Sequence, residues 1–258
     1  MKCNLALSVL FLSLTVSAGW PKAKPAATQQ KDADAKPAQA ASPKGGEQSI
    51  TSGDKDLDSV LSKMNKSSGS FSAAQADFTS TTYQKLMGNE EKLPGHIYFR
   101  RKNHAVEAAF DIGGDAPRQV VYQKGVLRVY NQKINQITER NVEKSRADVD
   151  AFLSLGFGAS GTDLTHDYDV KLAGWETMDG VKTAKLELSP KNEKLRNTYP
   201  RILLWIDPEK DTLLQQQFFE SSGDYRLVHY TNMKLSNKLP DDKFRLKTTG
   251  DVTTVKAQ

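Results

Sequence analysis

Apolar and polar residues alternate along most of the chain from residue 72 onward. Apolar side chains at every second position predict β-strands with one buried face. The strands expected from this pattern are 72–83, 95–101, 105–112, 119–123, 127–138, 170–176, 183–188, 201–207, 213–220 and 225–235. Most gaps between them are shorter than the dozen residues that a parallel crossover needs, so consecutive strands should pair antiparallel.

Two segments instead have the period of an amphipathic helix. The first begins at Asp56 in a capping position, and its apolar positions are Leu57, Val60, Leu61 and Met64. The second covers 145–157, where Ser145 and Asp148 have the spacing of a capping box. Its apolar face holds Val149, Phe152, Leu153 and Phe157.

About ten antiparallel strands with two or three short helices predict a mainly β (α+β) protein: one large curved antiparallel sheet forming an unclosed β-barrel, capped by short helices. The residues expected to line the apolar space under these helices are Ala76, Phe78, Ile97, Phe99, Val106, Ala108, Phe110, Phe152, Leu153, Ile202, Leu204 and Ile206. With few helices to cover so wide a sheet, an apolar cavity is one outcome. A core filled by side chains is the other, and periodicity alone leaves both open.

Two adjacent arginines end the second expected strand. Arg101 shares the inward parity of Ile97 and Phe99, and a buried guanidinium needs polar partners. We therefore expect Arg101 to find a partner under the helices, unless the strand has already ended and the side chain reaches solvent. Arg100 lies on the opposite face and is expected to be solvated.

The first eighteen residues have the three parts of a removable secretion signal. Lys2 precedes an uncharged apolar run over 5–16, and Ser17 and Ala18 form a small-residue exit. The apolar run is shorter than the roughly 20 residues of a spanning helix, although a retained anchor, or cleavage at Ala23 or Ala27, is an alternative. Cys3 lies before the apolar run, so it does not have the position of a lipid-accepting cysteine.

The rest of the chain divides by composition into three parts. Residues 19–54 are rich in Ala, Lys, Pro, Gln and Ser and predict a disordered linker, 55–249 the folded domain, and 250–258 a C-terminal tail. Loss of residues 1–18 removes Lys2 alone among charged residues and lowers the formal net charge from +5 to +4. The charges are interspersed, so nucleic-acid binding is not expected.

No motif predicts a metal or cofactor. The four histidines are far apart, and the acidic run at Asp54, Asp56 and Asp58 lacks the glycine and glutamate of a calcium loop. The acidic cluster of Asp163, His166, Asp167 and Asp169 is read as a solvated loop. With no cysteine after residue 3, disulfides are excluded from the exported chain.

Catalytic motifs are also missing. The glycines at 156, 158 and 161 match GxGxxG but follow a helix, so they lack the strand–turn–helix context of a dinucleotide site. We read them as a flexible joint, and no GxSxG or phosphate-binding loop is present. We therefore expect no enzymatic activity.

Several ordered motifs resemble the periplasmic outer-membrane lipoprotein carriers of the Lol pathway, with the likeness running over 57–247. The motifs are GSFSAAQADFT at 69–79, GHIYFRR at 95–101, KGVLRVYN at 124–131, IDPEKDTL at 206–213 and LPDDKF at 239–244. Each is weak alone, but their order and spacing are specific. In the family, the arginine that falls on Arg101 is commonly followed by proline, whereas this chain has Lys102.

The resemblance implies an unclosed barrel whose apolar cavity holds lipoprotein acyl chains, with Arg101 tying the helical lid to the sheet. It implies a monomeric periplasmic carrier with acylated lipoproteins as cargo. Its partners would be an ATP-driven lipoprotein release complex in the inner membrane and a lipoprotein receptor in the outer membrane. A carrier of free lipid or glycolipid, and an envelope-stress sensor that binds lipoproteins, are the alternatives.

Overall fold

The computed structural model describes residues 53–69, 72–102, 105–155, 157–210 and 212–257. The expected secretion signal, Cys3, the expected linker up to residue 52 and His104 lie outside the described residues. Within the described residues, no helix combines the length and apolar character needed to cross a membrane.

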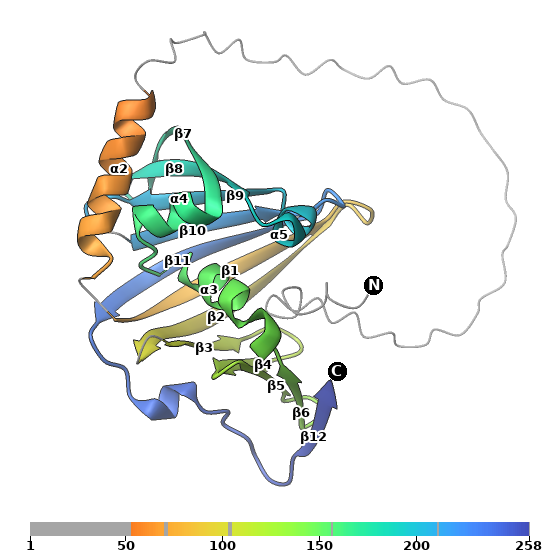
Figure 1. The fold of residues 1–258 in the computed structure, drawn as a ribbon. Helices are drawn as coiled ribbons and strands as arrows, with labels where there is room; N and C mark the ends of the chain where they lie inside the picture. Colours follow the sequence, from red (N-terminus) through yellow and green to blue (C-terminus); the bar gives the residue numbers. More distant parts are fainter. Residues whose placement is uncertain (1–52, 70–71, 103–104, 156, 211, 258) are drawn as a thin grey trace, which may run out of the picture.

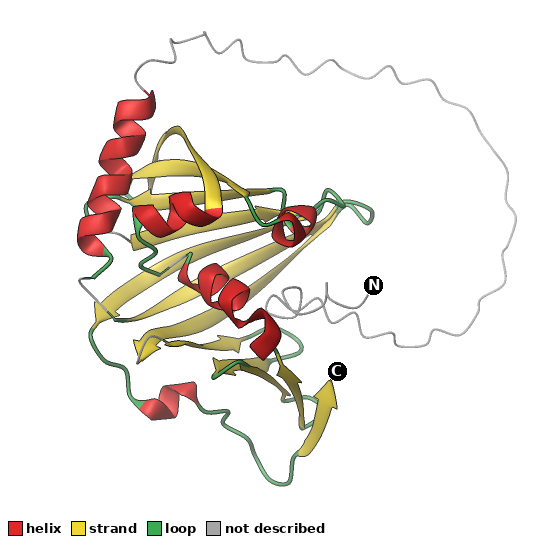
Figure 2. Ribbon diagram, viewed as in Figure 1, coloured by secondary structure: helices red, strands yellow, loops and turns green. Residues whose placement is uncertain are grey.

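A single sheet of twelve strands dominates the molecule, and it is not closed into a barrel (Figures 1 and 2). The strands are β1 Ala73–Gln84, β2 Asn89–Lys102, β3 Ala105–Ile112, β4 Arg118–Gln123, β5 Val126–Asn131, β6 Gln136–Asn141, β7 Tyr168–Met178, β8 Val181–Pro190, β9 Arg201–Asp207, β10 Thr212–Phe219, β11 Tyr225–Ser236 and β12 Thr253–Ala257. The expected mainly β class with an open, largely antiparallel sheet is confirmed.

The spatial order is β12-β6-β5-β4-β3-β2-β1-β11-β10-β9-β8-β7. Strands that are neighbours in this order pair antiparallel, and the pairing of β1 with β11 joins the two halves of the sheet. The exception is β12, which pairs parallel with β6 at one edge. Within the expected C-terminal tail, Thr253–Ala257 form an edge strand that completes the backbone hydrogen bonding of β6.

Four helices lie on the inner, concave face of the sheet (Figures 1 and 2). They are α2 Gly53–Ser67, α3 Arg146–Ser154, α4 Gly161–Asp167 and α5 Glu193–Thr198, with a 3-10 turn, Glu143–Ser145, leading into α3. The second 3-10 turn, η2 Asp241–Phe244, lies on the outer face. We call α3, α4 and the described residues between them the lid.

The prediction of one long strand at 127–138 is wrong. The chain turns after Asn131 and returns as β6, with Asn135 in the left-handed region at a φ of 48°. Asparagine tolerates that region better than most residues, and no glycine or proline marks the turn in the sequence. Alternation therefore continued across the turn and concealed it.

The expected helix at 145–157 is also different. It is α3 alone, and the Ser145 side chain makes no capping hydrogen bond. The capping box lies at Ser160 and Asp163, where it starts α4 in a segment expected to be a flexible joint and a loop. The glycine-rich surroundings of Ser160 suggest a hinge and so conceal this helix start in the sequence.

Gly161 allows α2 and α4 to approach each other. A Cβ built on Gly161 would lie 2.8 Å from the Cα of Leu61, and closer still to its carbonyl oxygen. Because this contact is with backbone, the clash cannot be relieved by a side-chain rotation. The requirement for glycine is therefore one of space between two helices.

We predict that Gly161→Ala lowers the free energy of unfolding by about 1–3 kcal/mol through this overpacking. It should also accelerate amide hydrogen exchange in α2, measured by mass spectrometry. Gly69→Ala is the matched control, since nothing lies within 4 Å of its Cβ position. Equal stability of the two variants would show that the helices separate without strain.

The outer face has its own small apolar cluster under residues 237–247, which we call the strap. Leu239 and Phe244 of the strap are buried on Ala73, Ala109 and Val121 of the sheet. The strap leads from β11 across the outer face toward β12 (Figure 1). Its burial explains why the two faces of β3 and β4 are both largely apolar.

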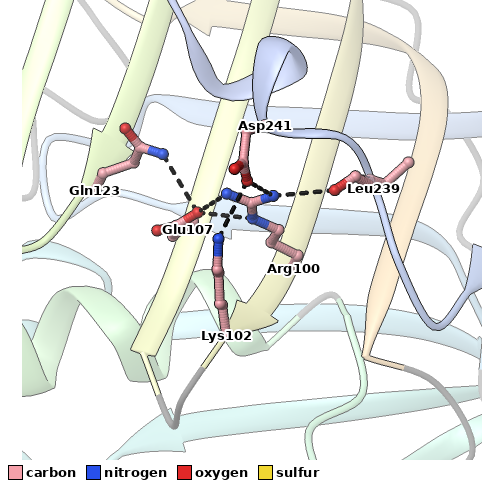
Figure 3. A network of polar contacts seen from close by, with 6 residues as sticks. All are labelled: Arg100, Lys102, Glu107, Gln123, Leu239 and Asp241. Atoms are coloured by element: carbon pink, nitrogen blue, oxygen red, sulfur yellow. Dashed lines mark hydrogen bonds and ion pairs between the residues drawn. The ribbon is translucent and has the colours of Figure 1, made fainter.

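Arg100 lies at the centre of a polar network under the strap, so the expectation that it reaches solvent is wrong (Figure 3). It is 7% exposed, donates from Nε to Glu107 at 2.7 Å and contacts Asp241 at 2.6 Å. It also donates to the carbonyl of Leu239 at 3.0 Å, and its guanidinium lies 4.0 Å above the ring of Phe244. The hydrogen bond from Arg100 lowers the pKa of the Asp241 carboxyl. The strand pattern could not reveal this, because the strap is remote in sequence.

Candidate functional site

The apolar residues expected to line the inner face lie in one cluster between the sheet and the helices. Those that are buried are Ala76, Phe78, Ile97, Phe99, Val106, Ala108, Phe152, Leu153, Ile202, Leu204 and Ile206. Phe110 is partly buried and packs against the same cluster. Strand alternation therefore located the inner face, and the helical period located Phe152 and Leu153 on the lid.

Aromatic rings from the lid fill much of the space above the sheet. The ring of Phe157 stacks on Phe99 of β2 with 5.3 Å between centroids and meets Tyr230 of β11 edge-on at 5.6 Å. Phe152 of α3 lies 5.0 Å from Phe218 of β10. Both lid rings are 3% exposed. In this conformation the apolar space is thus occupied by the lid's own side chains.

Arg101 joins the sheet to the lid. One nitrogen of its guanidinium donates to the carbonyl of Phe157 at 3.0 Å and to the carbonyl of Gly158 at 2.8 Å. Its own amide donates to the carbonyl of Ser72 at 2.7 Å, which keeps the end of β2 in place. The two lid carbonyls belong to the buried Phe157 and to the residue after it. Arg101 therefore holds the point at which the Phe157 ring enters the apolar space.

A second polar contact fixes α3 to the sheet. The hydroxyl of Tyr122, which points inward from β4, donates to Asp150 of α3 at 2.6 Å. Arg146 lies 3.6 Å from the other oxygen of that carboxylate, one helical turn away. Burial raises the pKa of the Asp150 carboxyl, and the hydrogen bond from Tyr122 acts in the opposite direction. Sequence reasoning missed this contact, although an inward tyrosine needs a hydroxyl partner.

We predict that Tyr122→Phe lowers the free energy of unfolding at neutral pH by about 1–3 kcal/mol, because the half-buried Asp150 carboxylate loses one of its hydrogen-bond donors. Without that donor the folded-state pKa of Asp150 rises further. Protonation then favours the folded state, so the deficit should shrink as the pH falls through this raised pKa. Chemical denaturation of the variant and the parent chain at several pH values measures this difference in the free energy of unfolding.

Tyr130→Phe is the control, because its hydroxyl bonds Asn135 within the β5–β6 hairpin at 2.7 Å and does not touch α3. Amide exchange of α3 should quicken in Tyr122→Phe and stay unchanged in Tyr130→Phe. A deficit independent of pH would show that Asp150 is not the group affected.

A pocket of about 450 Å³ opens between the lid and the ends of β2 and β3. Its lining includes Arg101 and Val106 of the strands and three lid carboxylates, Asp150, Asp163 and Asp167. We call it the acidic mouth. Among the described residues, no three His, Cys, Asp or Glu side chains are grouped so that they could hold a metal ion.

Comparisons with known proteins concern part of the sequence and the overall fold. A family model described only as that of an uncharacterized protein matches residues 159–241. No curated protein matches the chain in sequence.

Similar solved structures include a LolA superfamily protein from Nitrosomonas europaea, at 17% identity over 74% of this chain and 97% of that chain, with a TM-score of 0.36. An uncharacterized conserved protein from Thermus thermophilus has 14% identity over 78% of this chain and 99% of its own, with a TM-score of 0.49. The Pseudomonas aeruginosa MucA/MucB complex has 16% identity over 78% of this chain, which spans 64% of the matched chain, with a TM-score of 0.45. The neighbours thus include LolA superfamily proteins, and the likeness is one of fold.

Proposed function

We propose that this chain is an exported, non-enzymatic carrier that binds the acyl chains of lipid-modified proteins between the inner face of its sheet and its lid. The observation that carries the proposal is the stacking of Phe157 on Phe99 directly beside the Arg101 contacts. An apolar layer is covered there by a lid whose rings fill the space and whose attachment at the rim is polar. Another apolar group can therefore displace the rings of the lid from this space.

The energetics favour exchange between lid rings and acyl chains. Burial stabilises both in proportion to apolar area, at about 25 cal/mol per Å², or ~0.8 kcal/mol per methylene. The bonds at the rim contribute about 0.5–3 kcal/mol each, so a few buried methylenes outweigh them. The closed lid then competes with the cargo, and this competition weakens binding enough to permit release.

The cargo and route follow from the sequence resemblance. We propose that the protein works in the periplasm, accepts acylated lipoproteins from an ATP-driven release complex in the inner membrane and delivers them to an outer-membrane receptor. No step of this route requires this chain itself to catalyse a reaction, which agrees with a site built from apolar side chains and the hydrogen bonds of Arg101.

Organic extraction of the purified mature chain followed by mass spectrometry tests the proposal, together with a solubilisation assay using a triacylated lipoprotein. We expect bound acyl species and a soluble one-to-one complex with the lipoprotein. Recovery of free lipid without lipoprotein binding would instead identify a carrier of free lipid. Failure to bind any acylated molecule would refute the proposal.

A further inference from the structure

A second opening lies on the inner side of the sheet, beneath the C-terminal part of α2. The pocket measures about 650 Å³ and lies between α2, the β9–β10 turn and the end of β11. None of the residues expected to form the site lines it. We call it the basic mouth.

The floor of the basic mouth is apolar and continuous with the core. Met233 and Leu235 of β11 line the pocket and pack against the same cluster that contains Phe78 and Phe99. Leu235 pairs with Ala74, which is fully buried on the inner face. Met233 and Leu235 therefore connect the floor of the pocket with the apolar cluster under the lid.

The rim is positively charged. Among its lining residues, Lys63, Lys66 and Lys210 carry positive charge and only Glu209 carries negative charge. Glu209 forms an ion pair with Lys63, which bridges α2 and the β9–β10 turn. Within the described part of the chain, Lys66 and Lys210 have no ion-pair partner, and both are exposed.

The two mouths have opposite charge. The acidic mouth presents three carboxylates against Arg101, whose guanidinium is occupied by lid carbonyls. An anionic group would be repelled there and attracted at the basic mouth. The charges of the two mouths therefore favour the basic mouth as the entrance for an anionic amphiphile.

We infer that the basic mouth binds the anionic headgroup of an acyl lipid whose chains pass over Met233 and Leu235 into the space under the lid. This inference rests on the proposed function, since it assumes that the interior accepts acyl chains. It goes beyond the acylated proteins of that proposal to a free acyl lipid, and gives the class of its headgroup, a phosphate or a carboxylate, and the place where the headgroup binds. The Lys63–Glu209 pair orders the rim, while Lys66 and Lys210 are the groups available to the ligand.

The test compares ligands matched in their oleoyl chains: dioleoylphosphatidylglycerol with zwitterionic dioleoylphosphatidylcholine, and oleate with zwitterionic monooleoylphosphatidylcholine, with inorganic phosphate as the headgroup alone. Binding to the mature chain is measured by titration of each lipid from detergent micelles and of phosphate from solution. We expect each anionic ligand to bind about tenfold or more tightly than its zwitterionic counterpart, with a preference that falls at high salt. The larger of the two preferences identifies phosphate or carboxylate as the favoured headgroup.

The double variant Lys66→Glu/Lys210→Glu should abolish this preference while leaving phosphatidylcholine binding unchanged. Lys133→Glu, in the exposed β5–β6 turn, is a charge reversal away from the basic mouth and should preserve the preference. Equal binding of anionic and zwitterionic lipids by the parent chain would overturn the inference and leave the proposed carrier function intact. Binding of inorganic phosphate as tight as that of the lipid would overturn the amphiphile assignment. Absence of binding for every acyl ligand would overturn both.

Discussion

Replacing Arg100 by methionine should lower the free energy of unfolding by about 3–5 kcal/mol, because it leaves the buried Glu107 carboxylate without its cation. Glu107 is 7% exposed, and the amide of Gln123 also donates to it, at 3.2 Å. The variant also loses the stacking of the guanidinium on Phe244 and the bond to the Leu239 carbonyl. The strap should therefore loosen as the protein becomes less stable.

A double variant separates the ion pair from the packing around it. Arg100→Met/Glu107→Leu replaces both charges with apolar groups, which is often nearly neutral for a buried pair. It should recover most of the stability lost in Arg100→Met, measured by chemical denaturation. If the double variant is as unstable as the single one, the unpaired carboxylate is not the cause of the loss.

Arg101→Leu should have the largest effect on function. The closed lid and the cargo compete for the same apolar space, since Phe157 stacks on Phe99 there. Removing the two hydrogen bonds, which come from one guanidinium nitrogen, destabilises the closed lid by about 1.5–3 kcal/mol in total. We expect acyl ligands to bind about ten to a hundredfold more tightly and to be released correspondingly more slowly.

The release rate of a triacylated lipopeptide into acceptor vesicles measures this effect. Arg128→Leu is the control, because Arg128 pairs with Glu139 on the β5–β6 hairpin at 2.8 Å and does not touch the lid. Unchanged release by Arg101→Leu would remove Arg101 from the mechanism. Faster release together with weaker binding would show that the hydrogen bonds of Arg101 stabilise the ligand-loaded state.

Much of the inner face was predictable because alternation reports which side of a strand is buried. Ile202, Leu204 and Ile206 are on the inner face as expected, and β3 and β9 have the expected bounds. The parity of Arg101 also indicated that its side chain needs a partner on the inner side. The identity of that partner could not be derived, because it is a pair of backbone carbonyls in the lid. Every residue has a carbonyl, so the residue type does not show which ones accept a hydrogen bond.

The remaining features depend on contacts between segments far apart in the chain. Arg100 was expected to be solvated because nothing in β2 reveals the strap, which lies 139 residues away at Leu239. The basic mouth combines α2 with the β9–β10 turn, where Lys63 meets Glu209 across 146 positions. Local patterns in the sequence predict which face of a strand is buried. The sites at the ends of the sheet depend on how the sheet curves and brings distant segments together.

The central claim is that acyl chains lie between the sheet and the lid. A triacylated lipopeptide with a photoreactive diazirine near the end of one chain tests it most directly, with mass spectrometry locating the labelled residues. We predict labelling at inner-face positions such as Ala76, Phe99 and Leu204, which are fully buried without ligand. Labelling confined to the exposed apolar tip at Leu86 and Met87 would contradict the claim.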